Sequence, residues 1–395
     1  MSDKMTSQEL HSVLSLASIM SLRLLGLFMI VPVFALYARD LAGFTPYALG
    51  LAMGIYGLTQ GLFQIPGGML SDHIGRKPVI ALGLVIFALG STVCAYSHNM
   101  NELILGRALQ GAGAIGSTII AMIADLTREN QRTKAMAING ITIGFSFSIA
   151  MMLGPLAASW IGMKGIFWLA VFFSSIGLAV LFFIVPHSTS TWHADAEPEK
   201  RFFFKLLVEP QLARLNAGIF LLHVIFTASF VVIPLHLQKF AHVGSREQWQ
   251  IYVPTLLIAF VVSILCMMRA EKKHQVKAYF LAGICLLGIA EFTLFAWPNT
   301  IGSVLGLLLF FTAFSLLEAF LPSWVSRAAP AARKGTALGI YSSAQFLGIF
   351  AGGALGGFIY GLLGLQNVYL FCAGAALLWL GLAFGMKNPQ HPHSN

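Results

Sequence analysis

Long apolar windows recur along this chain and constrain its fold more than any other feature. Each runs for about 20 residues, the length that an α-helix needs to cross the hydrocarbon layer of a bilayer. We place twelve of them, with soft ends, at 14–38, 46–70, 77–97, 101–125, 134–160, 164–186, 214–239, 248–269, 276–296, 300–325, 335–362 and 366–386. Lipid offers no hydrogen-bond partners, so a spanning chain must form helices or a closed barrel. The windows predict an all-α polytopic membrane protein with twelve transmembrane helices.

The composition agrees with a membrane protein. Hydrophobic residues make up 57% of the 395 residues and charged residues 10%, whereas soluble domains contain roughly 25% charged residues. We expect no cleavable signal peptide, because residues 1–13 are polar and the first window is long enough to span. The four cysteines have spacings typical of neither a metal site nor a disulfide framework. We therefore expect no metal and no cofactor.

The positions of lysine and arginine predict the topology. If the N-terminus is cytoplasmic, 18 of the 24 basic residues fall on the cytoplasmic side. The outer side receives only Arg39, Lys164, Lys239 and Arg246. Cytoplasmic loops of membrane proteins carry such an excess of Lys and Arg, so both termini are expected to be cytoplasmic. The net charge of +9 then follows from topology, and no nucleic-acid partner is implied.

Residues 187–213 are the only long polar stretch between windows. They divide the chain into an N-terminal six-helix bundle at 1–186 and a C-terminal six-helix bundle at 214–395. Within this linker, residues 200–207 are basic and aromatic together, which predicts a short helix lying on the cytoplasmic leaflet. The halves repeat weakly, since Pro32 in the first window has a counterpart in Pro234 of the seventh.

A short charged stretch between the second and third windows contains a recognisable motif. It reads Gly68-Met-Leu-Ser-Asp72-His-Ile-Gly75-Arg76-Lys77. We expect a tight loop at the membrane surface, in which Asp72 faces Arg76 and Gly75 permits the turn. An ordinary basic loop that only sets topology is the alternative interpretation.

A second motif, R-x-x-Q-G-x-G-A, runs from Arg107 to Ala114. Together with G-x-x-x-D-x-x-G-R-K it resembles the two signature motifs of the major facilitator superfamily. This resemblance implies two pseudo-symmetric bundles of six helices, related by an axis along the membrane normal. It also implies a secondary transporter of the bacterial inner membrane that works by alternating access, with helices 1, 4, 7 and 10 lining the central cavity.

The fifth window carries Gly144 and Gly154-Pro155. This resembles the helix 5 motif of drug/proton antiporters, although Ala158 and Ser159 stand where that motif has a final glycine pair. The departure weakens the inference of antiport. Physically, Gly-Pro bends a helix and permits close packing.

An acidic residue, Asp125, ends the fourth window. A carboxylate is unfavourable at the C-terminal end of a helix and is expected to pair with a cation. We expect Asp72, Arg76 and Asp125 to form a charge cluster that locks the two halves while the protein is open outward. Three solvated loop charges are the alternative.

Three ionisable residues lie deeper within the windows. Arg23, His223 and Glu318 are each about seven to nine residues from a cytoplasmic end, on the order of 10–14 Å into the membrane. The family resemblance places all three near the cavity. A shielded carboxyl group favours its protonated form and an imidazole titrates near neutral pH, so Glu318 and His223 are candidate proton carriers. A static pair that stabilises packing is the alternative.

Two further charges fall inside windows. Arg107 lies near the outer surface, where an intramembrane charge costs roughly 2.5–3.5 kcal/mol on insertion scales and is expected to face a polar interior. Bracing and functional roles are both open for it. We expect Glu291 to brace its helices or to extend toward the outer surface.

The function that these features favour is proton-coupled efflux of a small amphipathic organic compound or drug. Candidate cavity residues are Gln60, Gln64, Phe226, Thr227, Phe230, Tyr341 and Gln345. Proton-coupled symport of a nutrient or metabolite is the alternative, and an intramembrane enzyme or sensor using His223 and Glu318 is a third. No nucleotide-binding loop, H-E-x-x-H helix or Ser/His constellation supports an enzyme. We expect a monomer whose partners are its substrate, protons and lipid.

Overall fold

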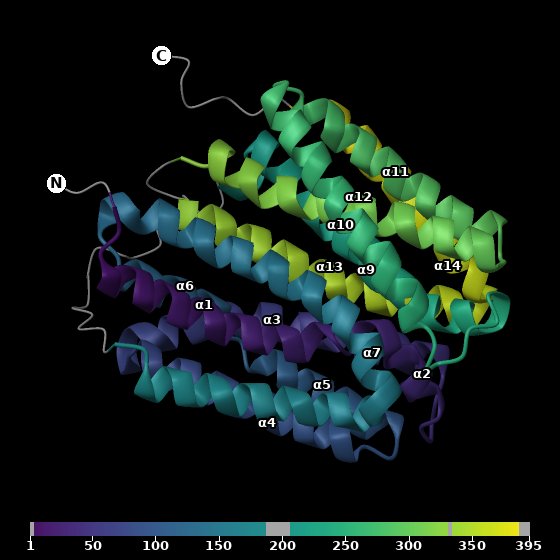
Figure 1. Cartoon of the computed structure of the whole chain (residues 1–395), viewed down its shortest axis with the longest axis horizontal. Helices are drawn as coiled ribbons and strands as arrows, with labels where there is room; N and C mark the ends of the chain where they lie inside the picture. Colours follow the sequence, from purple (N-terminus) through teal and green to yellow (C-terminus); the bar gives the residue numbers. More distant parts are fainter. Residues whose placement is uncertain (1–3, 187–205, 331–333, 387–395) are drawn as a thin grey trace. The chain divides into compact units, whose positions relative to one another are not determined.

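The computed structural model describes residues 4–186, 206–330 and 334–386. Figure 1 shows their helices, coloured by position in the sequence. These residues form helices and connecting turns without a β-strand. Their only strand-like pairing is an isolated bridge between Ala42 and Asn99. The expected surface helix at 200–207 lies mostly outside the described residues.

The chain divides into two compact units. One combines Met1–Gly43 with Leu58–Asp195, and the other combines Phe44–Gly57 with Ala196–Asn395. The contacts therefore assign the first part of one long helix to the second unit. Our division into bundles at 1–186 and 214–395 stays a prediction.

The first unit holds most of the N-terminal helices. They are α1 (Ser7–Phe28), the 3₁₀ turn η1 (Val31–Val33), α2 (Phe34–Arg39), α3 (Pro46–Ile74, shared with the second unit), α4 (Arg76–Tyr96), α5 (Met100–Ala112), α6 (Gly116–Asp125) and α7 (Glu129–Phe183). The second unit adds α9 (Pro210–Phe240), α10 (Trp249–Lys272), α11 (Val276–Ala296), α12 (Thr300–Ala328), α13 (Lys334–Leu363) and α14 (Leu365–Phe384).

The number of membrane spans agrees with the sequence. Eleven helical segments of the described chain are long and apolar enough to cross a bilayer. One of them, α7, has 55 residues and contains a break at Gly162, whose φ of 67° is not helical. This break separates the windows expected at 134–160 and 164–186, so the number of spans is twelve.

Two expected helices are interrupted. The window 14–38 begins earlier, at Ser7, because Thr6 and Glu9 form a capping box. It then breaks before η1, which contains Pro32 and so lacks one backbone donor. The window 101–125 breaks after Ala112, between α5 and α6. Gly113 lies at this second break, where a Cβ atom would be 3.0 Å from the backbone nitrogen of Phe87 on α4.

The expected loop at 68–77 is mostly helical. α3 continues to Ile74 and α4 starts at Arg76, so Gly75 alone connects them. Its φ is 95°, a conformation that side chains disfavour. The expectation of a turn at Gly75 was right, whereas the expectation of a loop from Gly68 was wrong. Asp72 in the last turn of α3 and Arg76 at the start of α4 pair with each other across this turn.

Small residues bring helices into contact in each unit. In the first unit, Gly26 of α1 faces Ala170 of α7, where a Cβ atom would lie 2.9 Å from the alanine Cα. In the second unit, Gly352 and Gly356 of α13 lie against Val224 and Ala228 of α9. Close backbone approach of this kind is typical of helix packing in membranes.

Candidate transport site

Three helices of the second unit bring together Glu318 from α12, Gln345 from α13 and His223 from α9. The Nε2 atom of Gln345 lies 2.9 Å from Nε2 of His223 and 3.4 Å from Oε1 of Glu318. The Nδ1 atom of His223 lies 3.2 Å from the carbonyl oxygen of Ile219. A carbonyl only accepts, so we assign the imidazole proton to Nδ1. Nε2 then accepts from the Gln345 amide, which donates to both neighbours.

Close packing of α13 on α9 positions this amide. Gly348 lies three residues after Gln345, and a Cβ atom there would be 3.1 Å from Cβ of His223. Only glycine permits the two backbones to approach so closely without displacing the histidine. Because α13 and α9 lie this close together, the Gln345 amide on α13 reaches the His223 imidazole on α9.

Glu318 keeps one oxygen without a hydrogen bond. Its Oε2 has no partner among the described residues, although the side chain is largely enclosed. The Tyr341 hydroxyl is also buried and lacks a described hydrogen-bond partner. A buried polar atom without a partner is costly, so such positions indicate a place for water, a proton or a ligand.

Aromatic side chains surround this polar group. Phe226 of α9 stacks on Phe314 of α12, with ring centroids 4.6 Å apart. His223 packs edge-on against the same Phe314 ring at 5.9 Å. Phe230 contacts Phe226 at 4.8 Å, and Thr227 is buried on the same helix. The cavity residues expected in the C-terminal half thus include one polar group, centred on Gln345, and one aromatic cluster.

The first unit contains its own buried polar chain. Nη2 of Arg23 donates to Oε1 of Gln60 at 2.7 Å, and Nε2 of Gln60 donates to Oε1 of Gln64 at 3.1 Å. The guanidinium also lies over the ring of Phe87, 5.2 Å from its centroid. Of the two glutamines expected in the cavity, Gln60 therefore binds Arg23 and Gln64 binds Gln60. Arg23 and Glu318 belong to different units, and their proximity stays a prediction.

Arg107 makes bracing contacts. Its Nη1 donates to Oε1 of Gln110 at 2.6 Å, and Nε2 of Gln110 donates to Oγ of Ser91 on α4 at 2.8 Å. The guanidinium lies 5.5 Å from the ring centroid of Phe34. The arginine and glutamine of the second motif thus connect α5 to α4 and to α2.

The charge cluster is present within the first unit. Nε of Arg76 lies 3.1 Å from Oδ2 of Asp125, and Nη1 pairs with Oδ1 of Asp72. Nη1 also donates to Oγ of Ser71 at 2.6 Å. Lys77 instead donates to the carbonyl oxygen of Val185 at 2.6 Å. The cluster of Asp72, Arg76 and Asp125 therefore forms, while its gating role stays a prediction.

The two glycines of the helix 5 motif differ in their surroundings. At Gly154 a Cβ atom would lie 2.9 Å from the Cα of Met29, at the break that follows α1. Pro155 follows within α7. At Gly144 nothing lies within 4 Å of such an atom. The close packing expected of the motif therefore holds at Gly154 and not at Gly144.

Some ionic contacts were missed by the sequence analysis. Arg128, just before α7, donates from Nε to Oε1 of Glu9 at 2.9 Å and from Nη2 to Oε2 at 3.0 Å. This bidentate bond to the Glu9 carboxylate raises the pKa of Arg128. The capping-box pattern at Thr6 and Glu9 signals the start of a helix, but it does not reveal a partner more than a hundred residues away.

Glu291 was expected to brace helices or to extend outward. Its side chain is fully buried inside the second unit, so it does not reach the surface. Oε1 instead accepts a hydrogen bond of 2.6 Å from Oγ of Ser229 on α9. His236 of α9, which the sequence analysis did not single out, is also buried and contacts Oγ of Ser303 through Nε2 at 3.0 Å.

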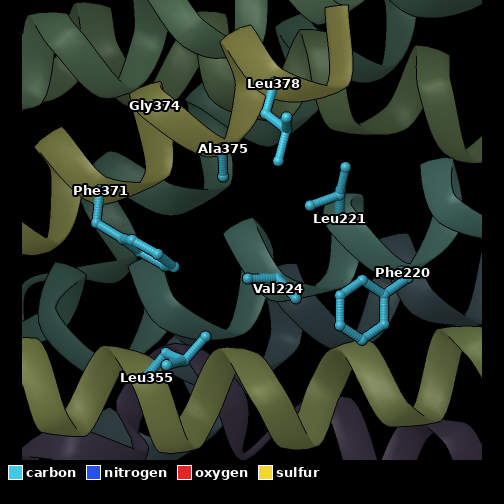
Figure 2. Close-up of a pocket in the computed structure, with 8 residues that line it drawn as sticks. All are labelled: Phe220, Leu221, Val224, Leu355, Phe371, Gly374, Ala375 and Leu378. Atoms are coloured by element: carbon cyan, nitrogen blue, oxygen red, sulfur yellow. The ribbon is translucent and has the colours of Figure 1, made fainter. Parts of the chain in front are cut away.

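An apolar crevice of about 430 Å³ lies between α9, α13 and α14 (Figure 2). Phe220, Leu221 and Val224 line it from α9, Leu355 from α13, and Phe371, Gly374, Ala375 and Leu378 from α14. None of these side chains can donate, accept or carry a proton. The crevice is therefore separate in chemistry from the Gln345 site. Among the described residues no group of His, Cys, Asp and Glu is arranged to hold a metal ion.

Comparison with known proteins agrees with the helices and motifs. A family model described as "Major Facilitator Superfamily" matches residues 16–350 and 245–395. The chain belongs to the major facilitator superfamily. This facilitator is a multi-pass transporter of the inner membrane and not an enzyme, which confirms the expected fold class and family.

Three similar proteins illustrate the relationship. The chain is 44% identical over 393 residues to inner membrane transport protein YajR of Escherichia coli (strain K12), covering 99% of this chain and 86% of that protein. It is 31% identical over 219 residues to quinolone resistance protein NorA of Staphylococcus aureus (strain MSSA476), covering 55% and 53% of the two chains. A bacterial homolog of the human lysosomal transporter Spinster, in an inward-facing and occupied conformation, shares the fold of this facilitator with a TM-score of 0.75 at 16% identity, covering 98% and 100% of the chains.

Proposed function

We propose that this facilitator exports a small amphipathic organic compound in exchange for protons. The observation that carries the proposal is the Gln345 amide, which joins His223 and Glu318 at 2.9 and 3.4 Å inside the second unit. A carboxyl group and an imidazole held within one hydrogen-bonded group can take up and release a proton.

One oxygen of Glu318 is held by Gln345, and the other oxygen is available to bind a proton. Gln345 bonds to Oε1 of Glu318 and leaves Oε2 without a described partner. A proton that binds to Oε2 therefore leaves the Gln345 contact intact, because Oε1 of the neutral acid still accepts. The carboxyl can change charge while its orientation stays fixed. His223, with its proton on Nδ1, presents Nε2 as a second acceptor in the same group.

The surroundings support an amphipathic substrate. The stacked rings of Phe226 and Phe314 offer flat apolar surface beside the polar group. Aromatic faces bind the apolar part of an organic molecule, while the few polar groups orient it. NorA, a relative over about half of this chain, is described as a quinolone resistance protein. Export of compounds with an aromatic and a charged part is consistent with both observations.

The predicted topology and the proposed antiport together give the direction in which protons would move. With both termini in the cytoplasm, as the 18 cytoplasmic basic residues predict, protons enter the cell down their gradient as the substrate leaves. Arg23, held by Gln60 in the first unit, is the cation that we propose meets ionised Glu318 in one state of the cycle. Protonation of Glu318 removes that attraction.

Transport into inside-out vesicles tests the proposal. Vesicles with an acidic lumen are given a fluorescent quinolone, and accumulation is compared with vesicles in which the pH gradient has been collapsed. Antiport predicts accumulation that requires the acidic lumen. Accumulation driven only when the lumen is alkaline indicates proton symport instead, and gradient-independent equilibration contradicts proton coupling.

A further inference from the structure

A second buried acidic residue lies in the second unit, away from Glu318. Glu291 of α11 has no exposed surface, and Oε1 accepts the bond from Ser229 at 2.6 Å. Oε2 has no hydrogen-bond partner among the described residues. The hydroxyls of Tyr252 on α10 and Tyr369 on α14 are buried and likewise lack described partners. Four helices therefore contribute to a cluster that has unused polar atoms.

The described side chains around Glu291 carry hydroxyl and thiol groups and no positive charge. Tyr369 and Cys372 of α14 interact with it electrostatically, and Tyr252 of α10 interacts with Tyr369. From α9, Ser229 donates its hydrogen bond to Glu291. Within the described chain no ion pair joins Glu291 to a cation. A buried carboxylate without a cation is less favourable than the neutral acid, so this arrangement favours the protonated form of Glu291.

Glu291 and Glu318 lie at different levels of the unit. Gly306 of α12 is at the level of Glu291, because a Cβ atom there would lie 3.4 Å from the carbonyl oxygen of Ala290. Glu318 is twelve residues further along α12, which corresponds to about 18 Å of helix. Phe310 and Phe314 lie between these levels and stack on one another. The two carboxyl groups are therefore separate sites.

Further polar side chains lie between Glu291 and the start of α12, and the described hydrogen bonds among them begin at His236. The ring of His236 packs against the ring of Tyr369 with centroids 5.3 Å apart. Nε2 of His236 contacts Oγ of Ser303 at 3.0 Å, and that hydroxyl donates to the carbonyl oxygen of Asn299 at 2.7 Å. Asn299 is exposed and caps α12. Nδ1 of His236 has no described hydrogen-bond partner and can accept a proton.

We propose that Glu291 is a second proton-binding site, which exchanges its proton through Tyr369 and His236 with the end of the unit at which α12 begins. Binding adds one proton to the Glu291 carboxylate and release restores the carboxylate, with no other bond formed or broken. Ser229, which donates to Oε1, is a positioning residue that stabilises the charged form, and the Tyr369 hydroxyl, which has no described hydrogen-bond partner, is the donor that we assign to Oε2 when the charge appears. This site goes beyond the proposed function, which uses Glu318 and His223 and not Glu291.

Proton counting on the purified full chain tests the site without any substrate. The protein in detergent is stepped through pH in weakly buffered solution, and bound protons are counted for wild type, E291Q, E318Q and the double variant. We expect E291Q to bind about one proton fewer per molecule than wild type, in addition to any loss caused by E318Q. An equal proton count in E291Q and wild type, with both folded and monodisperse, overturns the proposal. The E318Q comparison is separate, so failure of the proposed function leaves this result unaffected.

Infrared spectroscopy gives a second measurement on a chain that keeps the carboxyl group. The protonated carboxyl band of S229A and Y369F is followed against pH, with H236F for the exchange path. Loss of a hydroxyl that stabilises the carboxylate shifts the titration of this band to higher pH. H236F leaves the titration in place and slows hydrogen-deuterium exchange of the band. A band that does not titrate in any of these proteins shows a permanently protonated structural group and overturns the proposal.

Discussion

The Gln345 amide donates to His223 at 2.9 Å and to Glu318 at 3.4 Å, and it carries no charge in either state of its neighbours. A lysine or arginine at this position would hold Glu318 ionised through a direct ion pair. The amide instead orients the carboxyl group in both its charged and neutral forms. At the residue scale, this neutral link is what suits Glu318 to exchange a proton.

E318Q replaces the carboxyl group with a permanent mimic of its neutral form. We expect it to abolish substrate accumulation driven by a pH gradient and to leave substrate exchange measurable, because the Gln345 contact is kept while the proton site is lost. Proteoliposomes measured with and without the gradient check this. E271Q is the matched control, since Glu271 is exposed and pairs with Arg327 at 2.8 Å. If E318Q still accumulates substrate in response to the pH gradient, Glu318 is not the coupling residue and its role is structural.

A glycine in a helix is needed for close helix packing only where the backbone of another helix lies opposite it. Gly154 faces Met29 closely, whereas Gly144 ten residues earlier on α7 has open space. Two glycines of one motif therefore have different physical roles. At the scale of the element, the sequence pattern identifies the helix, and the neighbouring helix decides which glycine is needed.

We expect G154A to destabilise the protein by about 1–3 kcal/mol, because its methyl group would collide with the backbone at Met29. G144A is the control on the same helix, and it is expected to leave stability unchanged or to raise it by about 1 kcal/mol, since alanine favours a helix. Thermal unfolding of the two purified variants in detergent measures the difference. Equal melting temperatures would contradict the contact.

The ion pairs at the α3–α4 junction are the second element with a testable role. Arg76 binds Asp72 and Asp125 together, and we predict that this cluster favours the outward-open state. D72N removes one interaction worth about 1 kcal/mol, which changes a two-state ratio about fivefold toward inward-open.

Spin-label distances across the cytoplasmic mouth measure this shift. D40N is the matched control, because Asp40 pairs with Arg39 at an exposed site at 3.8 Å. An unchanged distance distribution in D72N shows that the cluster has no locking role.

The whole molecule is a set of spanning helices whose basic residues gather at one end of their windows. Arg76, Arg128 and Lys277 lie at the beginnings of α4, α7 and α11, at ends that the topology places in the cytoplasm, and each is hydrogen-bonded there. The same topology places both termini and residues 187–213 in the cytoplasm.

A reporter that is active only in the cytoplasm, fused after Asn395, is therefore expected to be active. The same reporter inserted at Gly244, in the connection between α9 and α10, is expected to be inactive because that connection lies outside. Cell fractionation with an enzymatic assay measures both fusions. An inactive fusion after Asn395 contradicts the topology.

The sequence by itself determined the spans of this protein, because burying about 20 apolar residues in lipid requires no knowledge of their neighbours. It also identified Gly75 as a turn and brought Asp72, Arg76 and Asp125 into one hypothesis, since opposite charges at helix ends attract over short connections. Glu318 and His223 were recognisable because an ionisable group within an apolar window is rare.

Only the tertiary structure decided which groups meet. Hydropathy averages over all faces of a helix, so it does not show that Glu291 faces Ser229 on a helix more than sixty residues away, or that Gln345 lies between His223 and Glu318. The breaks after α1 and α5 were also missed, because the apolar windows continue through them. Contacts between helices depend on rotation about each helix axis, and packing against neighbouring helices fixes that rotation.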